Sequence, residues 1–371
     1  MTKVLLHTPD GVRDIYGREC SDRILVKEKI HDKMKLFGYE DMETPTFEFF
    51  DVFAEEINAS DARELYKFFD KEGNTLVLRP DFTPSVARCA SKSMLENGTP
   101  IRVVYQGKSF LNTSNFQGKL KENYDIGVEL FNDDSVYADA EMIALLIESL
   151  KSSGLTDFQV SIGDADYYKG ICEEAGIDAE TESLIREQIV QKNYFAAESI
   201  MVERNIQDKY RNLLVKVSEF IGSDEALDNA EKEVSNKRSL SAIRRLKSLY
   251  GVLKEYNCSQ YVSFDLGMLS KFNYYTGVIF SAYTYGVGDA IAKGGRYDSL
   301  LGKYGKDAPA IGFVIILDDL MSALYRQNVE IEHEDEVVIL EFDENSFEAQ
   351  LSEAADLRKS GQKVALCYKK G

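Results

Sequence analysis

Two adjacent tyrosines are the residues with the clearest chemical potential in this chain of 371 residues. Tyr274 and Tyr275 lie in the stretch LSKFNYYTG, which runs from Leu269 to Gly277 and leads into the apolar run Val-Ile-Phe. This pattern predicts a strand that presents aromatic hydroxyls to a pocket, because a phenol both donates and accepts hydrogen bonds. Nothing else in the stretch resembles a catalytic group, so the stretch indicates binding. The alternative interpretation is that both tyrosines are core aromatics.

Histidines and cysteines are too scattered for a metal site or a disulfide framework. The three histidines are His7, His31 and His333, and none lies at metal-ligand spacing from another. The five cysteines are far apart, and no Cys-x-x-Cys pair occurs. This usage is typical of reduced cytosolic thiols, and the sequence has neither a membrane-length apolar run nor a signal-peptide pattern. We therefore expect a cytoplasmic protein with no metal, no cofactor and no membrane contact.

The charge balance argues against nucleic acid as a partner. The chain has 63 acidic and 44 basic residues, which give a formal net charge of −19. Nucleic-acid affinity depends mainly on lysines and arginines that neutralise phosphates. The basic clusters, at Lys119–Lys121 and between Lys237 and Lys247, are small and typical of solvated loops or helix faces. We expect no nucleic-acid partner.

The elements that must position the tyrosines have the pattern of an α+β protein. Periodicity and turn residues predict, in order, a helix ending near Phe37, a hairpin around residues 71–74, a helix over Pro84–Met94, strands at 101–111 and 124–131, a helix over Ala138–Ser152 and a strand at 158–164. From about residue 164 to 256 the periodicity is helical, which predicts a helical insertion. Strands then resume around the tyrosines, so we expect a mostly antiparallel sheet.

The last part of the chain has a different character. Residues 1–325 form the predicted core, residues 326–336 an acidic linker, and residues 337–371 a small α/β unit of strand, helix and strand. In that unit Asn345 is the expected helix N-cap and Gly361 the expected stop. One such unit cannot bury both faces of its sheet alone. It either belongs to a larger domain or packs on the rest.

Seven segments, in order, resemble the catalytic core of class II aminoacyl-tRNA synthetases, in the histidyl-tRNA synthetase branch. They are TPDGVRD, GYEDMETPTFE, LVLRPDFTPSVAR, YDIGVELF, NYYTGVIF, GGRYDSL and PAIGFVIILDDL. The resemblance covers roughly residues 5–325 and is weakest in the helical insertion. It implies the class II synthetase-like antiparallel sheet core, a C-terminal unit similar to the start of an anticodon-binding domain, and a two-fold dimer interface near Pro45.

The resemblance also identifies three positions at which the synthetases carry arginine. This sequence has Leu111, Ser270 and Asp319 there. The arginine fork suits phosphate chemistry because it stays charged and binds in a bidentate manner. Losing one preorganised donor typically costs about 10²–10³ in rate, so we expect these ATP-binding positions to be lost and catalysis to be absent. Substitution by a neighbouring lysine, Lys108 or Lys119, is the alternative.

The amino-acid side of the pocket is retained. The histidine-binding positions implied by the resemblance are Asp81, Thr83, Asp125, Glu129, Tyr274, Tyr275, Arg296 and Tyr297. Asp81 and Thr83 match residues near the α-ammonium group of the ligand, and Glu129 and Tyr275 match residues that contact its imidazole. Asp125 departs from the pattern, because the synthetases generally carry glutamine there.

Binding without catalysis on this fold is similar to the family of ATP phosphoribosyltransferase regulatory subunits. The resemblance implies a homodimer within a hetero-oligomer, with a short-form catalytic subunit as partner and histidine as the feedback ligand, at the first step of histidine biosynthesis. Two alternatives remain. One is an active histidyl-tRNA synthetase with an atypical site. The other is a stand-alone amino-acid sensor or tRNA-binding paralogue.

Overall fold

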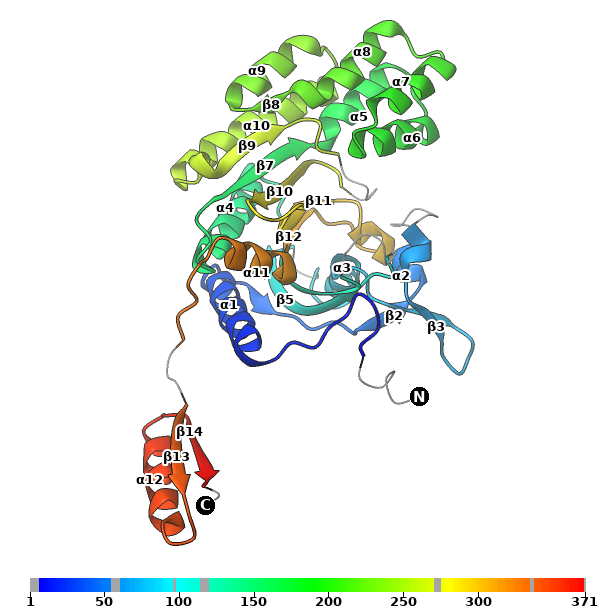
Figure 1. Cartoon of the computed structure of the whole chain (residues 1–371). Coiled ribbons are helices and arrows are strands. Elements are labelled where there is room, and N and C mark those ends of the chain that lie inside the picture. The colour runs from blue at the N-terminus through cyan, green and yellow to red at the C-terminus, as the bar shows by residue number, and fades with distance from the viewer. Residues whose placement is uncertain are drawn as a thin grey trace.

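A twisted nine-stranded sheet forms the centre of the computed structural model, which describes residues 7–54, 61–95, 98–113, 120–269, 275–333 and 337–369 (Figure 1). The strands, in their order across the sheet, are β1 (Glu40–Asp41), β5 (Ile101–Phe110), β6 (Glu122–Phe131), β12 (Ala310–Ile316), β11 (Ala292–Arg296), β10 (Val278–Thr284), β7 (Phe158–Asp164), β9 (Val262–Asp265) and β8 (Ile221–Gly222). Neighbours are antiparallel except at β1–β5 and β7–β9. The predicted α+β class with a mostly antiparallel sheet is confirmed.

The two faces of this sheet differ because successive side chains along a strand point to opposite sides. In β6, Ile126, Val128 and Leu130 are fully buried in the main hydrophobic core. Asp125 and Glu129 alternate with them and line a cavity on the other face. One strand therefore supplies both the core and the polar site.

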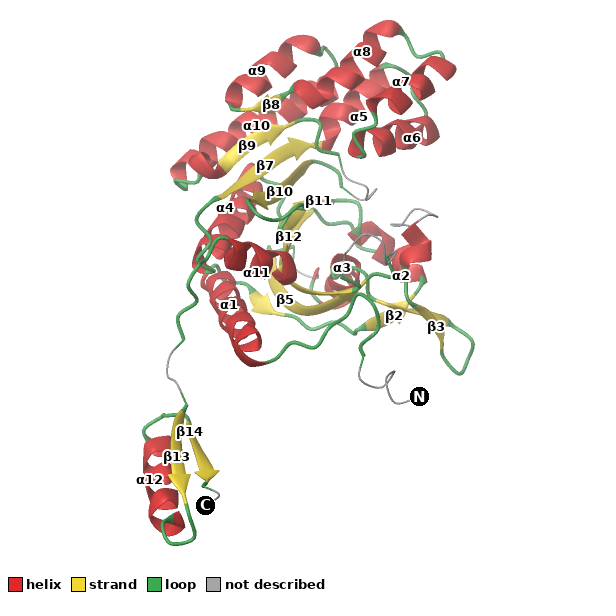
Figure 2. Ribbon diagram, in the orientation of Figure 1, coloured by secondary structure: helices red, strands yellow, loops and turns green. Residues whose placement is uncertain are grey.

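Helices α1 (Gly17–Leu36) and α4 (Val136–Ser152) contribute to the apolar side of the sheet (Figure 2). The α1 residues Val26, Ile30 and Met34, spaced by four, are all fully buried, as an amphipathic helix requires. The hydroxyl of Ser135 caps α4 by accepting from the amide of Ala138 at 3.2 Å. Helix α3 (Thr83–Ser93) belongs to a second core cluster with β5 and the residues after β11.

Helices gather beyond β7 and β9 at one end of the sheet (Figure 1). They are α5 (Ala165–Glu174), α6 (Ala179–Val190), α7 (Tyr194–Glu203), α8 (Asp208–Lys216), α9 (Asp224–Glu233) and α10 (Lys237–Glu255). The helical periodicity predicted here is confirmed, and the two-residue strand β8 is an addition that the sequence pattern missed. The limits of a separate domain at about residues 164 and 256 stay a prediction.

A smaller sheet of three strands lies beside the main one. It consists of β2 (Phe47–Phe49), β4 (Thr75–Leu78) and β3 (Lys67–Phe69), next to the short helix α2 (Asp51–Ala54). Strands β3 and β4 form the predicted hairpin, with Phe69 opposite Thr75. Phe47, Phe49 and Phe69 are each more than half exposed, so this sheet presents apolar rings to its surroundings.

The C-terminal unit contains β13 (Val338–Phe342), α12 (Phe347–Lys359) and β14 (Val364–Tyr368), with the two strands parallel. The expectation that Asn345 caps α12 is wrong. Ser346 is the N-cap residue, and the Asp343 carboxylate accepts from the amides of Asn345 and Ser346 at 3.0 and 2.9 Å. Gly361 follows α12 with a φ of 91°, in agreement with its expected role as a helix stop.

The segment that leads to this unit is tied to α1. Helix α11 (Leu317–Arg326) precedes it. His333 Nε2 lies 2.5 Å from Asp22 Oδ1, and the Tyr325 hydroxyl donates to the other carboxylate oxygen of Asp22 at 2.8 Å. Arg18 donates to the Ile331 carbonyl at 2.9 Å. These bonds fasten the chain to the core as far as residue 333.

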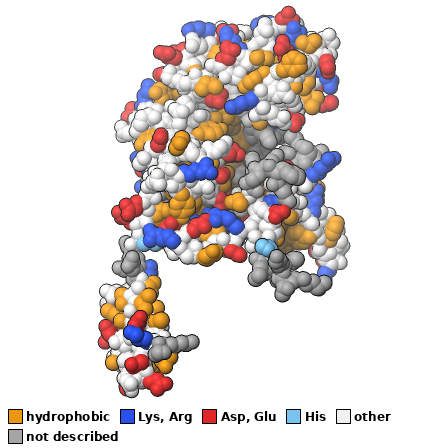
Figure 3. All heavy atoms as spheres, in the orientation of Figure 1, with side chains coloured by type: hydrophobic (Ala, Val, Ile, Leu, Met, Phe, Trp, Pro, Cys, Tyr) orange, Lys and Arg blue, Asp and Glu red, His pale blue; other side chains and the backbone are white. Residues whose placement is uncertain are grey.

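Acidic and basic side chains are interspersed over the face of the main body shown in Figure 3, and no large basic surface stands out there. None of the helices in the described ranges is long and apolar enough to cross a bilayer. The same residues contain no group of three or more His, Cys, Asp or Glu side chains arranged to hold a metal ion.

Candidate functional site

A cavity of about 690 Å³ lies on the polar face of the sheet, over β6, β11 and β12. It brings together most of the residues predicted from the sequence. The predicted positions that line it are Asp81, Thr83, Leu111, Asp125, Glu129, Tyr275, Tyr297 and Asp319. These residues come from segments more than 200 positions apart, so the fold assembles the cavity that the sequence motifs indicated.

Glu129, on β6, is the polar centre of the cavity. Its side chain is almost fully buried, and both of its carboxylate oxygens have hydroxyl partners. Thr83 Oγ1 donates to Oε1 at 2.9 Å, and the Tyr105 hydroxyl donates to the same oxygen at 3.2 Å. The Tyr297 hydroxyl donates to Oε2 at 2.5 Å. Three hydroxyls thus fix the carboxylate in one orientation.

Aromatic stacking holds Tyr105 in place. Its ring lies 4.7 Å from that of Phe82, with an angle of 12° between the planes. The guanidinium carbon of Arg79 lies 3.7 Å from the centroid of the Phe82 ring, and the guanidinium donates to the carbonyls of Lys108 and Thr44. Tyr105 was not among the site residues predicted from the sequence. Tyr105 lies two residues after Val103 in a predicted strand, so the two side chains were expected on the same face. Only the pairing of β5 with β6 shows that this face meets Glu129.

Glycines make room for these side chains. Gly312 on β12 lies directly opposite Glu129 on β6, and Gly127 lies opposite Tyr105. A β-carbon on Gly127 would lie 2.4 Å from the Tyr105 hydroxyl, a distance at which something must move. The floor of the cavity therefore depends on residues without side chains.

Burial sets the ionisation of the carboxyl groups. It raises the pKa of Glu129 to about 8, against the hydrogen bonds from Tyr297 and Thr83, which lower it. Burial likewise raises the pKa of Asp125 to about 7, against a hydrogen bond with Ser109. Burial therefore favours the protonated forms of both carboxyl groups at neutral pH, more so for Glu129 than for Asp125.

The lining of the cavity is acidic. Among the described residues that line it, seven carry carboxyl groups and two carry basic groups. The acids are Glu19, Asp81, Asp125, Glu129, Asp289, Asp318 and Asp319, and the bases are Arg13 and Lys293. Arg13 pairs with Glu19 at 2.6 Å and Lys293 with Asp289 at 3.3 Å. This lining favours a cationic group such as an ammonium and disfavours a polyphosphate.

Asp81 and Thr83 stand at the start of α3. The Asp81 carboxylate accepts from the amide of Thr83 at 3.2 Å, and Pro84 occupies the first turn of the helix. The helix start therefore orients the Thr83 hydroxyl toward Glu129 while Asp81 faces the cavity. The N-cap residue itself is Phe82.

Two of the positions that lack arginine lie at the cavity. Leu111 and Asp319 both line it, whereas Ser270 lies outside the described residues. Two buried arginines lie nearby but are engaged elsewhere. Arg79 stacks on Phe82, and Arg23 pairs with Asp318 at 2.7 Å. Lys108, one of the two possible substitutes, forms an ion pair with Glu122, and Lys119 lies outside the described residues.

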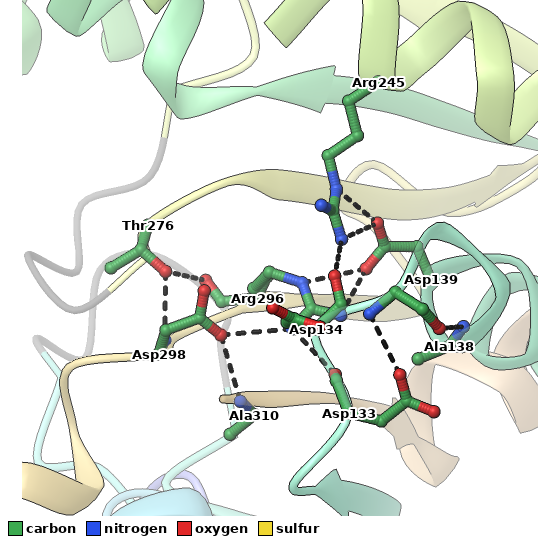
Figure 4. A network of polar contacts seen from close by, with 10 residues as sticks. Asp133, Asp134, Ala138, Asp139, Arg245, Thr276, Arg296, Asp298 and Ala310 are labelled. Carbon is green, nitrogen blue, oxygen red and sulfur yellow. Dashed lines mark hydrogen bonds and ion pairs between the residues drawn. The ribbon is translucent and has the colours of Figure 1, made fainter. Parts of the chain in front are cut away.

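Arg296, expected in the wall of the site, does not line the cavity. Its buried guanidinium donates twice to Asp139 Oδ1, at 2.9 and 2.7 Å, and also reaches the Asp133 carbonyl and Asp298 (Figure 4). Alternation along the chain explains this, since the neighbouring Tyr297 faces Glu129. Tyr274, the other expected wall residue, lies outside the described residues.

Comparison with known proteins gives concordant results. The family model described as histidyl-tRNA synthetase matches residues 11–320. An ATP phosphoribosyltransferase regulatory subunit of Acetivibrio thermocellus is 38% identical, over 98% of this chain and 87% of the relative. The protein of the same name from Ruminiclostridium cellulolyticum is 36% identical over the same shares.

Solved structures agree with these relatives. A Bacillus halodurans structure described as an ATP phosphoribosyltransferase regulatory subunit/histidyl-tRNA synthetase superposes with a TM-score of 0.87 at 30% identity, over 98% of this chain and 93% of that one. A histidyl-tRNA synthetase from Nostoc sp. PCC 7120 has a TM-score of 0.81 at 18% identity, over 98% and 86%. The second likeness concerns the fold alone.

Proposed function

Because the chain belongs to the histidyl-tRNA synthetase-like family of ATP phosphoribosyltransferase regulatory subunits, we propose that its acidic cavity binds histidine and that the bound amino acid controls a catalytic partner. The chain is a regulatory, non-catalytic subunit of this transferase and acts in histidine biosynthesis. The ligand, the form of the partner and the self-association are our proposals.

The observation that carries the proposal is the buried Glu129 within an acidic lining. Histidine has an ammonium group and an imidazole, and both find complementary groups here. Asp81 and Asp125 offer carboxylates to the ammonium, while Glu129 and Tyr275 offer hydrogen-bonding partners to the ring nitrogens. The hydroxyls of Tyr297 and Thr83 preorganise Glu129, so the ligand finds that carboxyl group already in position.

The same lining explains why the site binds an amino acid without activating it. Activation needs cations at the phosphates in the transition state. Leu111 is apolar, and Asp319 would repel a polyphosphate. Arg13 and Lys293, the basic residues in the described part of the lining, already have acidic neighbours.

The partner we propose is a short-form catalytic subunit of ATP phosphoribosyltransferase, located with this chain in the cytoplasm. Feedback requires only that histidine bind one state of the complex more tightly than the other. A coupling of about 1–3 kcal/mol changes the partner's affinity by roughly 5–150-fold. The fold can supply such a difference if the cavity changes shape when the partner binds.

Calorimetry with the whole chain tests the proposal. Histidine should bind, while leucine and ATP should not, and Glu129→Ala should weaken histidine binding by at least ~1–3 kcal/mol. Mixing the chain with a short-form catalytic subunit should give co-elution and histidine-sensitive transferase activity. Absence of histidine binding to the wild-type chain, or histidine-dependent ATP–pyrophosphate exchange, would rule the proposal out.

We also propose that the β2–β4–β3 sheet is the homodimer interface. The exposed rings of Phe47, Phe49 and Phe68 share one face of this sheet, because Phe49 and Phe68 both lie opposite Leu76. They form an apolar surface of the kind that marks association sites, and the resemblance implies a dimer interface near Pro45. Phe47→Asp with Phe49→Asp should shift the mass in solution from dimer to monomer in analytical ultracentrifugation. Phe195→Asp, at an exposed ring on α7, serves as the control.

A further inference from the structure

We propose that the helical region α5–α10 positions the ligand-contacting segment Tyr275–Gly277, through Lys169 directly and through Arg245 indirectly. Lys169 and Arg245 are thus positioning residues for the cavity, although neither lines it. The inference rests on the proposed histidine site and adds the element that controls its geometry. Its structural part does not depend on the identity of the ligand.

The direct contact comes from α5. Lys169 Nζ donates to the carbonyl of Tyr275 at 2.8 Å, and the ring of Tyr275 lines the cavity. The first amide of the same helix, that of Ala165, donates to the Gly277 carbonyl at 2.9 Å. Helix α5 therefore holds the segment at both of its ends, and Lys169 is the only side chain in this pair of contacts.

The partial burial of Lys169 increases the importance of its hydrogen bond to Tyr275. The side chain is half-buried, and this burial lowers the pKa of its ammonium. A hydrogen bond from a charged donor is typically stronger than a neutral one. Removal of the ammonium would leave the Tyr275 carbonyl without this donor, so the segment would lose its hold on α5 next to the ring that faces the ligand.

The indirect contact passes through Asp139, on α4. This fully buried carboxylate accepts from Arg296 on Oδ1 and from Arg245 of α10 on Oδ2, the latter at 2.6 Å. Figure 4 shows Asp139 lying between the two guanidinium groups. One carboxylate therefore links α10 of the helical region to β11 beneath the cavity.

The Arg296 backbone completes the connection to the segment. Its carbonyl accepts from the amide of Thr276 at 2.8 Å. The Thr276 hydroxyl accepts from the amide of Asp298 at 3.0 Å, and the Asp298 carboxylate accepts from Arg296 at 3.1 Å (Figure 4). A displacement of Arg296 would therefore be passed to Thr276, the residue that follows Tyr275.

The test combines amide hydrogen exchange with calorimetry on the full chain. Lys169→Met and Arg245→Met should each speed exchange at the Thr276 amide several-fold, while exchange at core amides of β6 stays unchanged. Both should raise the dissociation constant for histidine about tenfold, which corresponds to ~1.4 kcal/mol. The conservative variants Lys169→Arg and Arg245→Lys should show smaller changes in exchange and in histidine affinity than the methionine variants. Lys254→Met, on the exposed face of α10, should change neither quantity.

The outcomes separate this inference from the proposed function. Unchanged exchange at Thr276 in both variants overturns the inference, whether or not the wild-type chain binds histidine. Faster exchange with unaltered histidine affinity also overturns it, because the segment would then not govern the ligand. Faster exchange in a chain that binds no histidine would support the positioning contacts and reject the ligand. A uniform rise in exchange over the core would indicate general destabilisation and contradict the proposal.

Discussion

Gly312 and Glu129 lie directly opposite each other on β12 and β6, and the glutamate occupies the space of the missing side chain. A β-carbon on Gly312 would lie 1.6 Å from Glu129 Oε2 and 2.5 Å from the Val128 carbonyl oxygen. The orientation of the buried carboxylate therefore depends on the absence of a single methyl group on the neighbouring strand.

Gly312→Ala is expected to displace the Glu129 carboxylate and to abolish measurable histidine binding. Overpacking of this kind typically costs about 1–3 kcal/mol of stability. Calorimetry and chemical denaturation measure the two effects. Gly251→Ala is the matched control, because nothing lies within 4 Å of its added β-carbon and it sits inside α10, where alanine should stabilise by up to ~1 kcal/mol. Normal histidine affinity in Gly312→Ala would contradict the assignment of Glu129.

The stability of the ligand-free chain should respond to pH through Glu129. Its pKa is raised to about 8 in the folded state, whereas in the unfolded chain it ionises near the ordinary value of about 4.3. Between these values the folded state holds the proton more tightly, so its contribution to stability is complete below pH ~4.3 and is lost as pH rises toward 8.

Glu129→Gln removes this titration. The stability of the wild-type chain relative to the variant should fall as pH rises from 5 to 8, by at most ~1.4 kcal/mol per pH unit. Denaturation at several pH values measures the difference. A constant difference would show that folding does not shift the pKa of Glu129, and a difference that grows in favour of the wild type would show that folding lowers it.

Histidine binding should release protons near pH 7. An ammonium group in the cavity lowers the pKa of nearby carboxyl groups, and Glu129 and Asp125 start from raised pKa values of about 8 and about 7. Calorimetry in buffers of different ionisation enthalpy counts the protons. Release should be smaller in Glu129→Gln, and net proton uptake by the wild type would contradict the expectation.

ATP should not compete for the cavity. Its phosphates would meet Asp319 and an acidic lining, so we expect no nucleotide binding and no histidine-dependent pyrophosphate exchange. The pair Leu111→Arg and Asp319→Arg should bring detectable ATP binding, because two guanidinium groups replace an apolar and an acidic side chain. Equal nucleotide binding by the wild type and this double variant would show that the lining does not exclude ATP.

Local patterns were sufficient to predict most elements of the fold. The alternation in YDIGVELF separates Ile126 and Val128 from Asp125 and Glu129, and the structure places these two pairs on opposite faces of β6. The hairpin around Gly73 follows from its turn residues, and Gly73 has a φ of 86°. The two-residue strand β8 was missed because so short a segment has no periodicity of its own.

The site was less accessible to sequence reasoning because it depends on contacts between strands. Tyr105 and Gly312 contribute to the site because they lie diagonally and directly across the sheet from Glu129. The sequences of the single strands do not determine the register that brings them there. Arg296 was misplaced because the motif GGRYDSL contains both Arg296 and Tyr297, although adjacent residues in extended chain point to opposite sides. Asn345 was misjudged because Asp343, two residues earlier, supplies the competing side chain.

The bond between His333 and Asp22 has a consequence for the reach of the C-terminal unit. Only four residues separate His333, which is bonded to Asp22, from the first residue of β13, Val338. The five steps from residue 333 to residue 338 span at most about 18 Å even in a fully extended chain. The first residue of β13 therefore lies within about 18 Å of His333, which is itself bonded to α1. A second subunit that binds the start of β13 would therefore contact this chain near α1.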